Sequence, residues 1–417
     1  MQGASRWLWA VGLILLSLAW AQVREGLDLG ALNAFKARLE GEVAQGRLPG
    51  AVFLVARHGQ VVYHEAVGYL DPQTRSPMTR EAIFRIYSMT KPLTSALALA
   101  LAEEGRLSLT DPIPLYLPEF REAKVGVEKS GPGGQPTLEL VPASRPITVY
   151  DLLRHTSGIT YGIFFDSLVK QEYRRMGADA VDQTPEEFLG KLSRLPLQFQ
   201  PGTIWEYGNS TDLLGHLMER LTGKSLAQLL EERIFKPLGM TDAGFLVPQE
   251  KQSRIAEPFA IDPFTRQPTP PALDVRRSPK RHSGGAGAVA TALDYYRFLQ
   301  ALLNGGELGG RRILSPKSVA LMTQDHLGPL YLPSLQRGAP YLPGPGYGFG
   351  LGVAVRLADG GSPLPGTAGD YYWGGLFGTY FFVDPKEKLI GVWMMQNPGG
   401  RTYYAQLFRS AVYASLR

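Results

Sequence analysis

The spacing of apolar residues predicts a helix and then a pair of strands near the N-terminal end of the chain. Apolar positions recur at helical intervals over residues 30–46, which predicts an amphipathic helix. Two short apolar runs, 51–56 and 61–67, flank a turn at His58-Gly59, as in a β-hairpin. Towards the C-terminal end we expect further strands and a closing helix, at residues 347–356, 371–383, 389–395 and 403–416.

Between these ends, the pattern is that of short helices joined by Pro-rich loops. Residues 129–146 are rich in Gly and Pro and are expected to form a loop. Residues 246–283 form a long polar stretch with little periodicity. The helices of this middle part are expected near residues 148–155, 185–193, 210–222 and 225–235.

Strands at both chain ends with helices between them predict an α/β (α+β) fold. We expect one antiparallel sheet, flanked by helices and completed by both chain ends, plus an all-helical lobe. Residues 22–105 and 285–417 are expected to form the α/β lobe, and residues 106–284 the mostly helical lobe. The active site of such a two-lobed catalytic domain is expected between the lobes.

The first 21 residues have the form of an export signal. Arg6 precedes an apolar run from Trp7 to Trp20, and Ala19-Trp20-Ala21 offers a cleavage site of small residues. We expect cleavage near Ala21 and a secreted or periplasmic mature protein; the alternative is an uncleaved anchor. No later segment is apolar enough to span a membrane, so no stable membrane span is expected after cleavage.

Composition narrows the class of function. The 417 residues are 44% hydrophobic and 19% charged, a globular mixture that argues against disorder or a coiled coil. The net charge of +5 is spread without long runs, so nucleic acid is not an expected partner. The chain has no cysteine, which excludes a disulfide scaffold, a Cys-ligated metal and a cysteine nucleophile. Nothing indicates a cofactor, and the oligomeric state is open.

The candidate nucleophile is Ser88 in the S-x-x-K motif Ser88–Lys91. The chain has neither the G-x-S-x-G nor the H-E-x-x-H motif. Ser88 precedes the apolar stretch 88–104, and Pro92 is tolerated only in the first turn, so a buried helix begins at Ser88–Lys91. The free N–H groups and the dipole of that terminus favour an oxyanion, and Lys91 is within reach as a base.

The alternative for Ser88 is an N-cap serine with a salt-bridged lysine. A second S-x-x-K motif, Ser167–Lys170, runs into a polar helix and is not expected to be catalytic.

Two further motifs supply candidate groups for acyl transfer. Tyr207-Gly208-Asn209 carries a phenol that can relay a proton and an amide that can hold a substrate carbonyl and the Lys91 ammonium. Trp373-Gly374-Gly375 lies in an expected strand, where an N–H near Gly375–Leu376 can join the Ser88 N–H in an oxyanion hole. The alternative for Tyr207-Gly208-Asn209 is an aromatic core residue next to an Asn N-cap. The alternative for Trp373-Gly374-Gly375 is a β-bulge in a Gly-rich strand.

These motifs in this order resemble the serine β-lactamase/penicillin-recognising superfamily, in its class C-related branch that includes family VIII carboxylesterases. The resemblance covers about residues 30–415 and implies a β-lactamase/transpeptidase-like fold. It implies an acyl-enzyme on Ser88, with Lys91 and Tyr207 as coupled base and acid, and a structural role for His155. It is carried also by the strings at residues 84–91, 147–158, 237–240 and 284–287.

One departure from that superfamily bears on the substrate. Trp373-Gly374-Gly375 stands where class C β-lactamases carry Lys-Thr-Gly, so the cation that binds a substrate carboxylate is replaced by an apolar wall. An aromatic site suits neutral esters, and we expect an esterase of short-chain acyl esters. Further aromatic surface is expected from Tyr161, Phe164, Phe165, Tyr371 and Tyr372.

Other activities of the same fold stay open. A β-lactamase, DD-peptidase or D-amino-acid amidase would take a lactam or amide in place of the ester. Acyl transfer to a small alcohol would replace hydrolysis. A cell-wall or lactam-binding protein without turnover is a further alternative.

Overall fold

The computed structural model describes residues 23–330 and 344–417, so the expected export signal at residues 1–21 lies outside the described residues. Within them, a central sheet has the strand order β12-β13-β14-β15-β16-β3-β4-β5, and all neighbours run antiparallel. The expected α/β fold with an antiparallel sheet is confirmed. The strands are β3 (Gly50–Arg57), β4 (Gln60–Asp71), β5 (Ser76–Pro77), β12 (Tyr347–Phe349), β13 (Ala354–Arg356), β14 (Tyr371–Gly374), β15 (Tyr380–Asp384) and β16 (Leu389–Met395).

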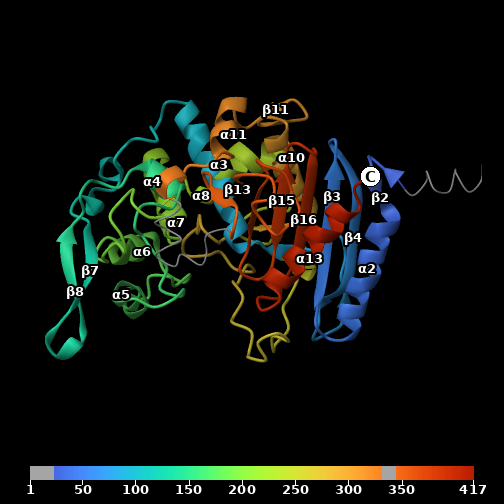
Figure 1. The fold of residues 1–417 in the computed structure, drawn as a ribbon, viewed down its shortest axis with the longest axis horizontal. Helices are drawn as coiled ribbons and strands as arrows, with labels where there is room; N and C mark the ends of the chain where they lie inside the picture. Colours follow the sequence, from blue (N-terminus) through green and yellow to red (C-terminus); the bar gives the residue numbers. More distant parts are fainter. Residues whose placement is uncertain (1–22, 331–343) are drawn as a thin grey trace, which may run out of the picture.

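Strands from the two ends of the chain meet in the middle of this sheet. β16 pairs with β3 from Leu389 opposite Arg57 to Met395 opposite Ala51. The expectation that both chain ends complete one sheet is therefore confirmed, and Figure 1 shows the blue and red strands side by side.

Helices cover both faces of the sheet, which explains why β3 is apolar at nearly every position. Phe53 packs under α2 (Leu29–Ala44) and α13 (Arg401–Ala414), against Phe35 and Phe408. Val52 and Leu54 point the other way, into the core that holds α3 (Thr90–Glu103) and α10 (Ala292–Leu303).

The helices expected in the middle of the chain are present, and side-chain caps mark several of their starts. Thr148, Thr184 and Ser225 each form a reciprocal capping box at the first turn. No helix in residues 23–330 and 344–417 is long and apolar enough to cross a membrane. The helices are α4 (Val149–Leu153), α5 (Leu168–Met176), α6 (Pro185–Leu192), α7 (Ser210–Thr222), α8 (Leu226–Leu230), α9 (Lys236–Leu238) and α11 (Pro316–Met322).

The prediction of a loop at residues 129–146 is wrong. This segment belongs to a hairpin of β7 (Lys124–Ser130) and β8 (Pro136–Pro142), which projects from the body at the end opposite α2 (Figure 1). Most of its side chains face solvent on both sides, so the strands lack the apolar alternation that identifies a half-buried strand. The Gly-rich turn between the two strands was therefore the strongest sequence signal, and it predicted a loop.

Two other expected strands are each divided by a turn. The single strand expected at 347–356 is the pair β12 and β13, and the strand expected at 371–383 is the pair β14 and β15. Gly378 adopts a φ of +97° in the second turn, a conformation that a residue with a Cβ rarely takes. The remaining short strands are β1 (Val23–Arg24), β2 (Leu27–Asp28), β6 (Phe84–Arg85), β9 (Val289–Ala290), β10 (Glu307–Leu308) and β11 (Arg311–Arg312).

Candidate active site

Ser88 and Lys91 lie together at the start of α3. The chain leaves β6, passes through the 3-10 turn η1 (Tyr87–Met89) and enters α3 at Thr90, with Pro92 in the first turn as expected. Lys91 is completely buried, and its Nζ donates to Ser88 Oγ at 3.3 Å and to the carbonyl oxygen of Gly285 at 2.9 Å. Ser88 Oγ and Lys91 Nζ are therefore close enough to exchange a proton.

Two tyrosines contact Lys91 in different ways. Its Nζ lies 3.2 Å from the Tyr161 hydroxyl oxygen and 4.6 Å from the centre of the Tyr207 ring. Burial holds the pKa of Tyr161 well above its usual value, so this phenol keeps its proton and accepts the lysine hydrogen bond. Tyr207, from the motif that the sequence singled out, is half-buried and offers the face of its ring to the ammonium.

Tyr207 is the centre of an aromatic cluster. Trp205 stacks on it at 5.8 Å, and Trp373 meets it edge-on at 5.5 Å. Burial holds the pKa of His155 well below its usual value, so this histidine is neutral and serves as a packing surface behind Tyr207. The rings around Tyr207 are those of His155, Tyr161, Phe164, Trp205 and Trp373.

The other expected aromatic residues lie elsewhere. Tyr371 is buried in the core, and Tyr372 packs edge-on against Tyr347 at 4.9 Å. Phe165 has an exposed fraction of 55%. Of the residues expected to extend the aromatic wall, Tyr161 and Phe164 contact Tyr207.

Asn209 uses both amide hydrogens within the protein. Its Nδ2 donates to the Thr160 carbonyl oxygen at 3.0 Å and to Asp179 Oδ1 at 2.8 Å. The same Asp179 carboxylate accepts the N–H of Gly162 at 2.7 Å. These bonds tie the Tyr207 loop to the segment that carries Tyr161, so in this structure the amide positions the two tyrosines.

The Trp373–Leu376 segment runs directly beside the turn that carries Ser88. A Cβ on Gly375 would lie 2.5 Å from the carbonyl oxygen of Ile86, so only glycine permits this approach. The Gly375 N–H is already bonded to the Thr379 carbonyl oxygen at 2.7 Å. The N–H groups of Ser88 and Leu376 make no hydrogen bond within residues 23–330 and 344–417. Among the described residues both N–H groups are therefore free to donate to a ligand, as is that of Phe377 in the same turn as Leu376.

Sequence reasoning missed an ion pair beneath the lysine. Asp212 Oδ1 accepts from Arg281 Nη1 at 3.0 Å and from Ser283 Oγ at 2.5 Å, and the Asp212 and Arg281 side chains are 3% exposed. A Cβ on Gly285 would lie 2.2 Å from Asp212 Oδ2, so the carboxylate lies next to the residue that binds Lys91. Burial opposes ionisation, but Arg281 and Lys91 hold the Asp212 pKa below its usual value. Its place five residues after Tyr207, on a buried helix face, was the available signal.

The second S-x-x-K motif, Ser167–Lys170, supplies a helix cap and an ion pair. Ser167 caps α5 by accepting the Lys170 N–H at 3.1 Å, and Lys170 Nζ pairs with Glu206 at 2.8 Å. The lysine of this motif therefore pairs with a carboxylate and the serine caps a helix, so the two side chains bind different partners.

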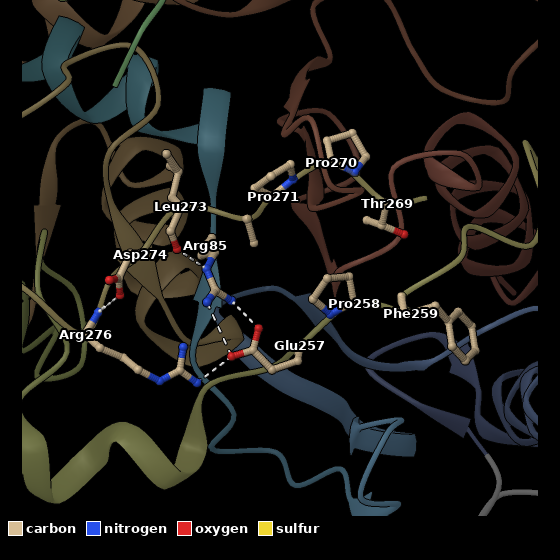
Figure 2. Close-up of a pocket in the computed structure, with 12 residues that line it drawn as sticks. Arg85, Glu257, Pro258, Phe259, Thr269, Pro270, Pro271, Leu273, Asp274 and Arg276 are labelled. Carbon is tan, nitrogen blue, oxygen red and sulfur yellow. Dashed lines mark hydrogen bonds and ion pairs between the residues drawn. The ribbon is translucent and has the colours of Figure 1, made fainter. Parts of the chain in front are cut away.

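A separate pocket of about 490 Å³ includes Arg85, three residues before Ser88, in its lining (Figure 2). The Arg85 guanidinium is fully engaged by Glu257 and by backbone carbonyls, including that of Leu273 at 2.5 Å. Arg276 also pairs with Glu257. Prolines and Phe259 complete much of the wall. Two of the charged side chains of this pocket, Arg85 and Arg276, thus share Glu257, and the remaining one, Asp274, pairs with Arg277 outside the lining.

No cluster of three or more potential metal ligands occurs in the part of the chain that the structure describes. The groups gathered around Ser88 are a hydroxyl, an ammonium, phenols and N–H donors. Such a set is suited to acyl transfer without a bound cofactor.

The chain belongs to the Beta-lactamase family, which it matches over residues 35–414. The family expected from the motifs is confirmed. Its relatives include Protein Rv1367c of Mycobacterium tuberculosis (strain ATCC 25618 / H37Rv), 37% identical over 84% of this chain and 86% of the relative. Esterase EstB of Burkholderia gladioli is 33% identical over 93% of this chain and 97% of its own length.

Among solved structures, the chain is similar to EstCE1, described as a hydrolase with promiscuous acyltransferase activity. The TM-score is 0.75 at 28% identity, over 91% of this chain and 99% of that one. The chain is therefore an enzyme of the β-lactamase fold, in a hydrolase and acyltransferase family with esterase members.

Proposed function

We propose that this enzyme is a serine esterase that acts on short-chain, uncharged acyl esters through an acyl-enzyme on Ser88. The observation that carries the proposal is the 3.3 Å contact between Ser88 Oγ and the buried Lys91 Nζ, beside the aromatic cluster of Tyr207. The esterase relative described above supports the same class of substrate.

The first half of the reaction forms the acyl-enzyme. Lys91 Nζ takes the Ser88 hydroxyl proton while Oγ bonds to the ester carbonyl carbon. The N–H groups of Ser88 and Leu376 stabilise the negative charge on the carbonyl oxygen. The tetrahedral intermediate then breaks its bond to the alcohol oxygen, which receives a proton from Tyr207, and Lys91 returns its proton to Tyr207.

The second half releases the acid. A water molecule bonds to the acyl carbon and loses a proton to the Lys91–Tyr207 pair. The Ser88 Oγ then leaves and takes that proton, which restores the starting enzyme and frees the carboxylic acid. Tyr161 and Asn209 act in both halves as positioning residues, because they hold Lys91 and the Tyr207 loop in place.

Trp373 supports an uncharged substrate. Its side chain is 8% exposed and packs edge-on against Tyr207, so the position that holds a lysine in class C β-lactamases is here part of an aromatic wall. A carboxylate placed there would lose its hydration without gaining a cation. An ester with an apolar acyl group carries no charge there, so it loses no comparable hydration.

Acyl transfer to a small alcohol is a second candidate, and the acyltransferase activity named for EstCE1 favours it. The alcohol would take the place of water in the second half-reaction. Product analysis with added methanol distinguishes the two outcomes: a methyl ester indicates transfer, and the free acid alone indicates hydrolysis.

The deciding experiment compares the wild-type protein, Ser88→Ala and the control Ser167→Ala. Each is mixed with p-nitrophenyl butyrate and, separately, with a chromogenic cephalosporin. Rapid ester turnover that is lost in Ser88→Ala and kept in Ser167→Ala supports the proposal. Faster turnover of the cephalosporin would favour a β-lactamase. A stoichiometric burst without turnover would indicate a binding protein, and no reaction with either would favour a peptidase or amidase.

We also propose that residues 1–21 direct export, so that the mature enzyme is secreted or periplasmic. The single charge of Arg6, the apolar run after it and the small residues at Ala19 and Ala21 support this. N-terminal sequencing of protein recovered from outside the cytoplasm tests it. A mature chain that begins at Gln22 supports cleavage, and one that keeps Met1 contradicts it.

A further inference from the structure

The residue before the nucleophile has an unusual backbone conformation. Tyr87 adopts a φ of +44°, in the left-handed region that residues other than glycine seldom occupy. Its ring is almost completely buried. A strained conformation next to a reacting group persists only where the surroundings hold it, so the contacts of the Tyr87 side chain identify what holds it.

Two contacts hold the Tyr87 ring. Phe377 stacks on it face to face, with ring centres 4.6 Å apart and planes 7° apart. The Tyr87 hydroxyl oxygen accepts the N–H of Leu273 at 3.3 Å, and the Leu273 carbonyl in turn accepts from Arg85 (Figure 2). The nucleophile turn is thereby tied to the β14–β15 turn and to the wall of the 490 Å³ pocket.

The stacked rings are the sequence neighbours of the two proposed oxyanion donors, the N–H groups of Ser88 and Leu376. Tyr87 directly precedes Ser88, and Phe377 directly follows Leu376. The donors come from turns almost three hundred positions apart in the chain, and no backbone hydrogen bond joins Tyr87 or Ser88 to Leu376 or Phe377. Thr379 Oγ1 ties the base of the β14–β15 turn to Ile86 at 3.1 Å, which leaves the spacing at the tip to the two rings.

We propose that the Tyr87–Phe377 stack is a positioning device that sets the distance and orientation between the Ser88 and Leu376 N–H groups. This inference rests on the proposed acyl-enzyme function and adds to it the pair of side chains that assembles the oxyanion hole. Neither ring touches the reacting atoms. The stack acts on the transition state because an oxyanion bonds both donors only when the two turns are held in register.

Four variants separate the contributions. Tyr87→Gly keeps the left-handed backbone and removes the ring, and Phe377→Ala removes the partner ring. Tyr87→Phe keeps the stack and removes only the hydroxyl. Tyr413→Ala is the matched control: Tyr413, on α13, stacks on Phe382 at 5.5 Å, bonds Asp384 through its hydroxyl and packs against the core.

We expect Tyr87→Gly and Phe377→Ala each to lower kcat on p-nitrophenyl butyrate by about 100-fold with KM changed less than about threefold, the loss typical of misplaced reacting groups. The double variant loses no more than about threefold beyond either one, because both changes abolish the same stack. Tyr87→Phe stays within about threefold of the wild type. Tyr413→Ala lowers Tm without changing kcat.

The result that overturns the proposal is a lowered Tm with an unchanged kcat in Tyr87→Gly and Phe377→Ala, as expected for Tyr413→Ala, or losses that multiply in the double variant. Ser88→Ala, measured in parallel, separates this inference from the function on which it rests. If Ser88→Ala is inactive and the stack variants keep their kcat, the positioning role alone is wrong. If Ser88→Ala remains active, the proposed function fails with it.

Discussion

The ammonium nitrogen of Lys91 lies 3.2 Å from the hydroxyl oxygen of Tyr161, a residue outside the three sequence motifs. Tyr207, inside the second motif, presents its ring to the same nitrogen at 4.6 Å. One tyrosine therefore holds the lysine through a buried hydrogen bond, and the other, which is half-buried, contacts it through the face of its ring. The two are expected to differ when each loses its hydroxyl.

Tyr207→Phe is expected to lower kcat by about 10²–10⁴-fold, the range for a lost acid–base group. Tyr161→Phe removes one acceptor from the buried ammonium and is expected to cost less, about 10–100-fold, in line with a hydrogen bond to a charged group. Steady-state kinetics on p-nitrophenyl butyrate measures both. A larger loss in Tyr161→Phe than in Tyr207→Phe would exchange their roles.

Trp373→Lys is expected to shift preference towards substrates that carry a carboxylate, because it restores a cation at the aromatic wall. The measurement is the ratio of kcat/KM for a carboxylated ester to that for its methyl-capped analogue. Trp373→Phe keeps an uncharged ring and is the control, with an unchanged ratio. A ratio in Trp373→Lys equal to that of the wild type would contradict the role of this wall in selectivity.

Asp212→Asn is expected to destabilise the fold by about 3–5 kcal/mol, because it leaves the buried Arg281 guanidinium without its carboxylate. Urea unfolding at neutral pH gives the difference. Asp274→Asn breaks an exposed pair with Arg277 and serves as the control, with an expected cost of about 1 kcal/mol or less. Equal effects of the two changes would show that burial does not strengthen the Asp212 pair.

Acid is expected to remove a stabilising contribution from Asp151. Burial opposes its ionisation, but hydrogen bonds from Arg145 and the Thr148 N–H hold its pKa below the usual value of 3.8. A lowered folded-state pKa means that the contribution is complete above pH ~4 and is lost as pH falls through the folded pKa. The stability gap between wild type and Asp151→Asn therefore narrows from pH 7 to pH 3 in urea unfolding. A gap that widens on acidification would contradict this assignment.

The sequence predicted contacts between residues that are close together in the chain, and missed contacts that form only when distant segments fold together. Ser88 and Lys91 are one helical turn apart, and Pro92 marks the start of their helix, so their contact follows from local rules. Tyr161 was expected only as aromatic surface, and its hydrogen bond to Lys91, like the Asp212 charge near that lysine, comes from a separate segment whose distance a single sequence does not record.

The same contrast applies to the fold. Strands that pack against helices are recognisable in the sequence by their apolar residues. β3 and β16 are two such strands, and both were predicted. The β7–β8 hairpin exposes most of its side chains and was predicted as a loop, because solvent-facing strands have no apolar face to detect. Asn209 shows the limit for single residues: its type suggested substrate contact, whereas both its amide hydrogens bind the protein.

The pairing of β3 with β16 has a consequence for the order in which the enzyme comes into being. A ribosome makes the β3–β4 hairpin and the nucleophile helix early, yet the strand that borders β3 is made more than three hundred residues later. Until then the hairpin has an open edge, and Ser88 lacks the β14–β15 turn that lies beside it. The proposed active site is therefore the last part of the enzyme to be completed during synthesis, and a product that stops before β14 carries Ser88 without the turn that lies beside it.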